Sequence, residues 1–187
     1  MALRNDCNIV VTFGFYVYIA LFLLVLPIHW FCAWVVAVTL HETGHFVAIR
    51  LCGAKARRIC FHAMKIEIET DALSTRQECI CAMAGPAGSL LATMLICRFP
   101  LVGFFGALQL MYNLIPVYPS DGGRVIRCVL GECSAIPSVI ERVFCVLFWV
   151  AALYFTFYLR VGLFPILAVV LIQWQRKPCK LSHKRVQ

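Results

Sequence analysis

The chain has 187 residues, of which 62% are hydrophobic and 14% are charged. Soluble domains average about 45–50% apolar and about 25% charged residues, so this composition excludes both a water-soluble globule and a disordered chain. The net charge of +8 does not indicate nucleic-acid binding, because the basic residues lie at the ends of apolar runs. We therefore predict a protein embedded in the lipid bilayer that binds no nucleic acid.

Six apolar stretches are candidate transmembrane helices, since a helix needs about 20 residues to cross a bilayer. They are Asn8–Leu26, Trp30–Cys52, Ile80–Phe99, Leu101–Val117, Ile136–Tyr158 and Val161–Trp174. The first is too long for a signal peptide and lacks a small-residue cleavage site, and the last is short for a span. We predict an all-α polytopic membrane protein, a single domain over residues 1–187 with its core over 30–133 and no PDZ or CBS module.

The distribution of lysine and arginine predicts the orientation. With the N-terminus in the cytoplasm, fourteen of the 17 basic residues fall in cytoplasmic segments, and only Arg98 and Arg160 fall in outside loops. This bias follows the positive-inside rule, so both termini are predicted to be cytoplasmic. The 11 cysteines lie in apolar runs or in these cytoplasmic segments and form no CxxC motif. We therefore predict small buried apolar side chains and reduced thiols rather than disulfides or a metal cluster.

One segment departs from the helical pattern. Between Arg58 and Thr70 apolar and acidic residues come to alternate, with Ile66 and Ile68 separated by glutamates. A period of two is typical of a β-strand, so we predict one or two strands at the cytoplasmic membrane surface. The alternative is an irregular loop.

The second predicted span contains His41-Glu42-Thr43-Gly44-His45. Residues i and i+4 share a face of a helix, so both imidazoles can bind one metal ion, and Glu42 beside them can take a proton from a water molecule. Ionisable groups inside a span are costly and usually functional. The alternative is a polar cluster that satisfies its own hydrogen bonds between packed helices.

A catalytic zinc site usually has three protein ligands. Asp121 supplies a candidate third ligand, because it follows two prolines at the cytoplasmic end of the fourth span. Arg50 marks the cytoplasmic end of the helix that carries His41 and His45, so charge bias and ligand geometry place all three groups at one depth. Taken alone, Asp121 and its two glycines could be a plain helix-breaking turn.

Two further segments near these residues have competing interpretations. Asn113 lies about two turns before Asp121 and can either bind a substrate backbone or form an interhelical hydrogen bond. The segment Ala84-Gly-Pro-Ala-Gly-Ser89 is expected to interrupt the third span and to permit close helix packing, and we assign it no chemistry.

These motifs together resemble the site-2 protease family of intramembrane zinc metalloproteases. The matching pieces are His41-Glu-Thr-Gly-His45, Ala84-Gly-Pro86 and Asn113-Leu-Ile-Pro116 followed by Asp121-Gly122. The six-span layout is most similar to the branch of stage IV sporulation protein FB. We expect no CBS regulatory module after the last span, in contrast to many members of that branch. Ser120 and Ser89 also stand where other residue types are usual.

The resemblance implies an endopeptidase with one Zn²⁺ held by His41, His45 and Asp121, with Glu42 as the catalytic base. It implies a membrane-tethered substrate, such as a pro-sigma-factor or an anti-sigma protein, cut near the cytoplasmic side of a bacterial membrane. It also implies an inhibitory membrane protein as a further partner. The substrate-binding candidates are Asn113 and Pro116, with Ile66 and Ile68 pairing to an extended substrate.

The same residues allow two other interpretations. A membrane metal carrier or sensor could use the His and Asp groups without proteolysis. Apart from Arg98 at the end of span three, however, spans one, three and six contain no charged residue that would extend a transport path. A catalytically silent assembly protein is disfavoured by the presence of Glu42. Zinc is the expected ion for two imidazoles and a carboxylate, while iron or cobalt could occupy the site in vitro.

Overall fold

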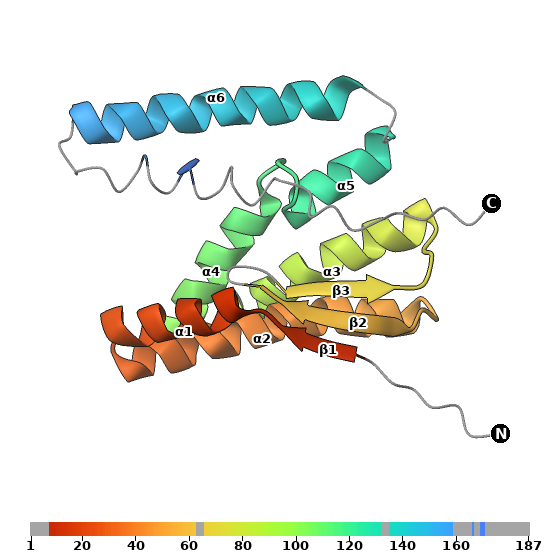
Figure 1. The fold of residues 1–187 in the computed structure, drawn as a ribbon, viewed down its shortest axis with the longest axis horizontal. Helices are drawn as coiled ribbons and strands as arrows, with labels where there is room; N and C mark the ends of the chain where they lie inside the picture. Colours follow the sequence, from red (N-terminus) through yellow and green to blue (C-terminus); the bar gives the residue numbers. More distant parts are fainter. Residues whose placement is uncertain (1–7, 63–65, 132–134, 159–165, 167–168, 171–187) are drawn as a thin grey trace. The chain divides into compact units, whose positions relative to one another are not determined.

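The computed structural model describes residues 8–62, 66–131, 135–158, 166 and 169–170. The chain divides into two compact units, Met1–Ile115 and Pro116–Gln187. The first unit contains a three-stranded sheet and four α-helices, and the second contains α5 and α6 (Figure 1).

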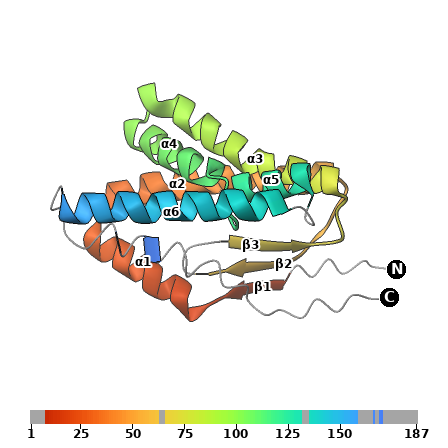
Figure 2. The ribbon, with the colours of Figure 1, turned by 90° about the horizontal axis from the view of Figure 1, so that it is seen from above.

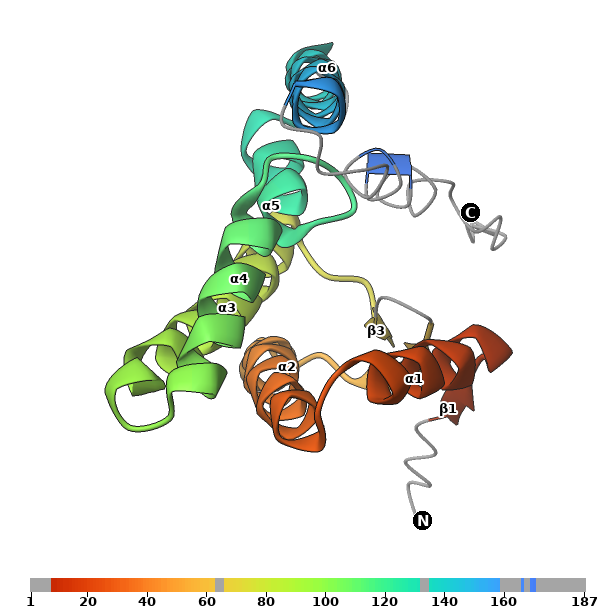
Figure 3. The same ribbon diagram turned by 90° about the vertical axis from the view of Figure 1, so that its left-hand side faces the viewer.

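Each α-helix of the first unit overlaps one of the predicted spans. They are α1 (Phe13–Val25), α2 (Ile28–Leu51), α3 (Thr75–Met94) with the 3₁₀ turn η1 (Leu95–Cys97), and α4 (Pro100–Leu114). Of these, α2, α3 and α4 pack against one another, and α3 and α4 run side by side (Figure 3). Pro100 begins α4 at a position where its missing N–H needs no helical partner.

Three helices of the described residues are long and apolar enough to cross a membrane: α2, α3 with η1, and α6 (Ala135–Phe157). Two shorter apolar helices, α1 and α4, coincide with the first and fourth predicted spans. Most of the sixth predicted span, Val161–Trp174, lies outside the described residues. The count of six spans therefore stays a prediction.

A small mixed sheet lies beside the helices in the strand order β1-β2-β3 (Figure 2). Strand β2 (Ala56–Phe61) pairs antiparallel with β3 (Ile66–Thr70), with Ile59 opposite Ile68 and Phe61 opposite Ile66. The predicted strands after the second span are confirmed, and the alternative of an irregular loop is wrong.

The third strand was not predicted. Strand β1 (Asn8–Val11) occupies the first residues of the predicted first span and pairs in parallel with Arg58–Phe61 of β2. Its β-branched residues suit a strand, and Thr12 then fixes its end, because both the backbone N–H and the Oγ1 of Thr12 donate to the Phe61 carbonyl, at 3.0 and 2.9 Å. Helix α1 therefore starts at Phe13 rather than at Asn8.

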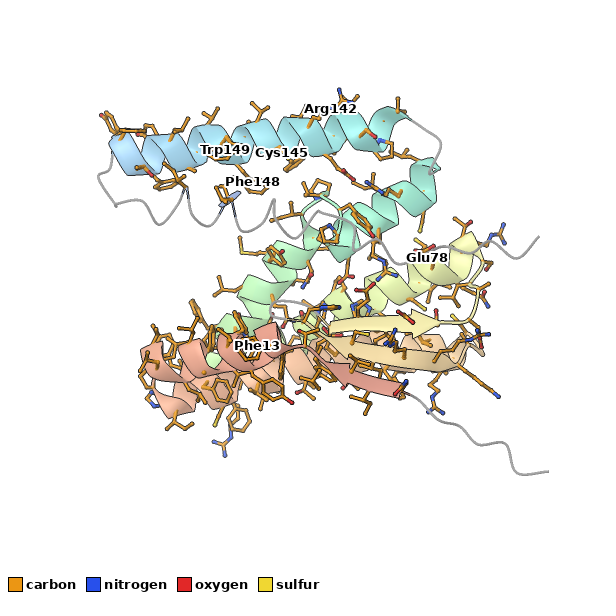
Figure 4. All side chains as sticks on the ribbon, viewed as in Figure 1. Phe13, Glu78, Arg142, Cys145, Phe148 and Trp149 are labelled. Carbon is orange, nitrogen blue, oxygen red and sulfur yellow. The ribbon has the colours of Figure 1, made fainter. Side chains whose placement is uncertain are left out.

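Small residues fill the interior of the first unit, and large apolar side chains lie on its surface. Ala37, Ala82 and Ala92 are fully buried, whereas 82% of Phe13 at the start of α1 is exposed (Figure 4). This distribution is opposite to that of a water-soluble core and suits helices surrounded by lipid. The eight cysteines of the described residues form no disulfide bonds in the structure.

The second unit is held by an ion pair between its helices. In α5 (Asp121–Leu130), the Arg127 guanidinium donates to Glu141 of α6 at 3.0 and 2.8 Å. The same guanidinium lies 4.4 Å from the centre of the Tyr118 ring, so it links the segment before α5 to α6. A half-buried arginine with a carboxylate and an aromatic partner stabilises this contact more than an exposed pair would.

Helix α3 begins with a capping box at Ser74. The Ser74 hydroxyl accepts from the Gln77 backbone N–H, and the Gln77 side chain accepts from the Ser74 backbone N–H at 2.9 Å. We predict that Ser74→Ala lowers the free energy of unfolding by about 1 kcal/mol, because an orphan helix N–H loses its partner. Thermal unfolding in detergent micelles measures this, with Ser138→Ala, an exposed serine inside α6, as the control that should change little. Equal unfolding midpoints for the two variants would contradict the role of the cap.

Candidate metal centre

Two histidines of α2 bring ring nitrogens together. His41 and His45 lie one helical turn apart, and their Nε2 atoms are 3.2 Å from each other. The ring planes are almost perpendicular, at 84°. Two imidazole nitrogens that converge in this way from positions i and i+4 form half of a tetrahedral zinc site.

The opposite nitrogen of each ring is held by α3. The Nδ1 of His45 lies 2.7 Å from the Cys81 carbonyl oxygen, and the Nδ1 of His41 lies 2.8 Å from the Ser89 hydroxyl. Because a carbonyl can only accept, His45 carries its proton on Nδ1 and presents a lone pair at Nε2. Metal-binding histidines usually have such a partner on the far nitrogen. The residues present therefore fit a divalent metal ion.

Glycines make this contact between α2 and α3 possible. A Cβ at Gly85 would overlap the His45 ring and lie 2.8 Å from Cε1 of His41, and a Cβ at Gly88 would lie 3.1 Å from the Cα of His41. A Cβ at Gly44 would meet the Ala84 carbonyl from the other side. The predicted close packing at this segment is confirmed.

The predicted interruption of the helix at the Gly-Pro segment is wrong. Helix α3 continues from Thr75 to Met94 with Pro86 inside it. Proline removes only its own N–H donor from the ladder of helical hydrogen bonds, and packing against α2 on the same face keeps the helix continuous.

Sequence reasoning assigned no chemistry to the segment that positions the rings. Cys81, Gly85 and Ser89 are spaced by four residues, so they form one stripe along α3 that faces both histidines. This spacing is visible in the sequence and is the signal that would have identified these residues.

Asp121 is the first residue of α5, in the second unit. Asp121 and the two glycines after it, for which a plain turn was the alternative, therefore form the start of a helix. The Ser120 side chain caps this helix by accepting from the Gly123 backbone N–H at 3.3 Å. A Cβ at Gly123 would overlap backbone atoms of Val117 and Tyr118, which explains a glycine here. The helix N-terminus stabilises the ionised carboxylate of Asp121, and Arg124 one turn later lies 3.9 Å from it.

The other candidate residues lie on α2, on β3 and at the end of α4. Glu42 is half-buried on α2 next to His41. Asn113 donates from Nδ2 to the Gln109 carbonyl at 3.1 Å within α4, and Pro116 follows the end of that helix. Ile66 and Ile68 are half-buried on β3, an edge strand of the sheet. The substrate-binding roles of these four residues stay predictions.

The chain is similar to known proteins in sequence and in fold. No protein-family model matches the chain. A zinc metalloprotease of Methanocaldococcus jannaschii, MJ0392, is 30% identical over 111 residues, which cover 52% of this chain and 33% of that protein. The chain thus matches about a third of the length of that relative.

A solved structure of a site-2 protease from the same organism superposes with a TM-score of 0.66 at 22% sequence identity, over 100% of this chain and 97% of the other. At this identity the likeness establishes the fold, which is that of a site-2 protease. The predicted fold resemblance is thereby confirmed, while the similarity to one particular branch stays a prediction.

The close contact between Gly85 and the two histidine rings can be tested directly. We predict that Gly85→Ala weakens zinc binding by at least about tenfold, because the added methyl group displaces the His45 ring and separates the two Nε2 atoms. Competition with a chromogenic chelator measures the affinity. Ala87→Ser, at an exposed position of the same helix, is the control that should bind zinc as the parent does. Parental affinity in Gly85→Ala would contradict the tight contact.

Proposed function

We propose that the chain is an intramembrane zinc endopeptidase that cuts a membrane-tethered protein. His41, His45 and Asp121 would hold one Zn²⁺, and Glu42 would be the catalytic base. The observation that carries the proposal is the pair of Nε2 atoms 3.2 Å apart, each on a ring whose Nδ1 is held by α3. The site-2 protease fold and the zinc metalloprotease relative support the same activity.

The donor set is appropriate for zinc because two imidazoles and one carboxylate leave a fourth position open. Asp121 completes this set by residue type, and a capped helix N-terminus is a favourable place for a negatively charged side chain. When bound, zinc acts as a Lewis acid that polarises the scissile carbonyl and lowers the pKa of water.

Glu42 performs the proton transfers of the hydrolysis. Its carboxylate takes a proton from the attacking water as the oxygen–carbon bond forms. It then delivers this proton to the leaving amine nitrogen as the peptide bond breaks. The exchange needs no other acid or base, so the removal of Glu42 is expected to stop turnover without disturbing the ligands.

An extended substrate is required because the carbonyls of a helix are engaged in hydrogen bonds. Strand β3 is an edge strand of the sheet, with β2 on one side. We propose that the substrate pairs with its other side around Ile66 and Ile68, as an added strand. Asn113 and Pro116, at the end of α4, would then contact the substrate backbone near the scissile bond.

The proposal extends to the orientation of the chain in the membrane and to its substrate. Both termini and the sheet would lie on the cytoplasmic side of a bacterial membrane that the chain crosses several times. The resemblance to stage IV sporulation protein FB makes a pro-sigma-factor or an anti-sigma protein the first substrate to test. An inhibitory membrane protein would be a further partner.

The central test compares the purified protein with two variants. Glu42→Gln is expected to retain zinc and to lose cleavage of a membrane-tethered pro-sigma-type substrate by at least about a thousandfold, since it removes only the base. Asp121→Ala is expected to lose zinc affinity as well, because it removes a ligand. Zinc content by atomic absorption and cleavage in proteoliposomes are the measurements.

Each outcome of this comparison separates one role from another. Equal cleavage by the parent and Glu42→Gln would exclude Glu42 as the base. Parental zinc affinity in Asp121→Ala would exclude that ligand. Zinc in the parent without cleavage of any membrane-tethered substrate would contradict proteolysis and favour a metal-handling protein.

The role of the edge strand is tested separately. We predict that Ile66→Pro and Ile68→Pro abolish cleavage while zinc content is unchanged, because proline removes backbone donors and bends the strand. Ile66→Val and Ile68→Val keep the backbone N–H and the β-branched shape, so both should cleave as the parent does. Full activity in the proline variants would contradict substrate pairing at β3.

A further inference from the structure

An open apolar groove lies between the first part of α2 and the start of α4, within the first unit. Its volume is about 360 Å³, and among the described residues that line it only Arg98 is charged. We propose that the groove binds one anionic phospholipid, with the lipid phosphate on the Arg98 guanidinium and an acyl chain between the two helices. The proposal rests on the apolar helices lying in a membrane and is independent of proteolysis.

The shape of the groove follows from the packing of its walls. A Cβ at Gly103 would lie 2.4 Å from the Cα of Ile96, so α4 packs tightly on η1 and holds its first turn in place. The opposite wall is α2, which contributes Cys32, Ala33 and Val36. These side chains are short, and Val36 is 45% exposed, so the groove is open along its side to the surroundings of the protein. A flexible chain can therefore enter it from the lipid.

Arg98 supplies a cation that lacks a counter-ion within its unit. It is the only charged residue of the sequence between Glu78 and Asp121. Its guanidinium lies 6.0 Å from the centre of the Phe99 ring, and no carboxylate of the described residues pairs with it. A guanidinium matches the geometry of a phosphate group through paired N–H donors. An exposed arginine beside an apolar groove thus complements a phosphate that is joined to an acyl chain.

The groove also lies at a suitable depth. From Cys32 to Arg50 helix α2 rises about 27 Å at 1.5 Å per residue, close to the thickness of about 30 Å of a bilayer core. Arg50 lies at the end of α2 that leads into the sheet, so Arg98 lies near the headgroups of the other leaflet. Trp30 marks the same level, with ring contacts to Phe104 and Phe105 at 6.4 and 6.0 Å.

The charge of the lipid decides the preference, because the apolar walls offer an acyl chain little that the bilayer does not. Phosphatidylcholine carries its own cation beside the phosphate, whereas phosphatidylglycerol presents a net negative charge to Arg98. A basic residue near the membrane surface favours an anionic lipid by about fivefold. The same ratio is the expected preference of this groove.

The test uses the full chain in phosphatidylcholine vesicles that contain a small fraction of a photoactivatable phosphatidylglycerol, with a diazirine on its acyl chain. Mass spectrometry of peptides then measures labelling of the α2 and α4 residues that line the groove. Arg98→Gln is expected to lower this labelling about fivefold. Arg98→Lys keeps the charge and should retain most of it.

Arg50→Gln is the matched control for the charge. Arg50 also lies over a phenylalanine ring, 5.0 Å from the centre of Phe46, but it does not line the groove. This variant should label as the parent does. The corresponding pair for the groove itself is Val36→Phe, which fills the space and should lower labelling, and Val35→Phe, an exposed position outside the groove that should not.

Three outcomes would overturn the proposal. The first is equal labelling of the groove by phosphatidylglycerol and phosphatidylcholine probes. The second is parental labelling in Arg98→Gln. The third is an unlabelled groove in a chain that forms a dimer, with Val36→Phe as a monomer, which would assign the groove to a second copy. Since no arm of the test measures cleavage, failure of the proposed protease activity would leave its result unchanged.

Discussion

The close approach of α2 and α3 is the constraint on which the metal centre depends. Gly44 of α2 lies against the Ala84 carbonyl, and Gly85 and Gly88 of α3 leave no room for a Cβ beside the histidine-bearing turn. Because the backbones approach this closely, Cys81 and Ser89 reach the outer nitrogens of the two rings. A wider spacing would separate both imidazoles from these two partners on α3, and the rings would lose the contacts that fix their orientation.

The same spacing suits a protein in lipid. Within a bilayer, apolar burial provides little drive for helices to associate, and close van der Waals contact between small residues takes its place. The buried alanines of α2 and α3 supply that contact, while large apolar side chains face outward. Packing and site geometry thus have one cause, since the residues that allow the helices to associate also position the rings.

Much of this arrangement could be predicted from the sequence, and the exceptions have physical reasons. The apolar runs predicted five of the observed helices, and the alternation around Ile66 predicted β3. Strand β1 was missed because an apolar segment reads as part of a span until its distant partner, β2, is known. The continuity of α3 through Pro86 was missed because local propensity does not include packing against a neighbour.

The candidate metal centre also contains residues that the sequence predicted and residues that it did not. His41 and His45 were predicted from their spacing alone, because two residues four apart always share a helix face. Their partners on α3 were not, since the stripe of Cys81, Gly85 and Ser89 acquires meaning only when a second helix lies against it. Metal-ligand candidates that lie on one helix can be predicted from sequence spacing. The hydrogen-bond partners that a second helix provides can be identified only once the packing of the two helices is known.

The parallel pairing of β1 with β2 constrains the path of the chain through the two helices between them. Hydrogen bonds join residues 8–11 of β1 to residues 58–61 of β2, and the chain between these strands forms α1 and α2. The end of α2 must therefore lie near the start of α1. The two helices therefore form a helical hairpin whose two ends are joined by the sheet. If α1 and α2 lie in a membrane, β1, β2 and β3 are on the same side of it, and this conclusion does not depend on any count of charges.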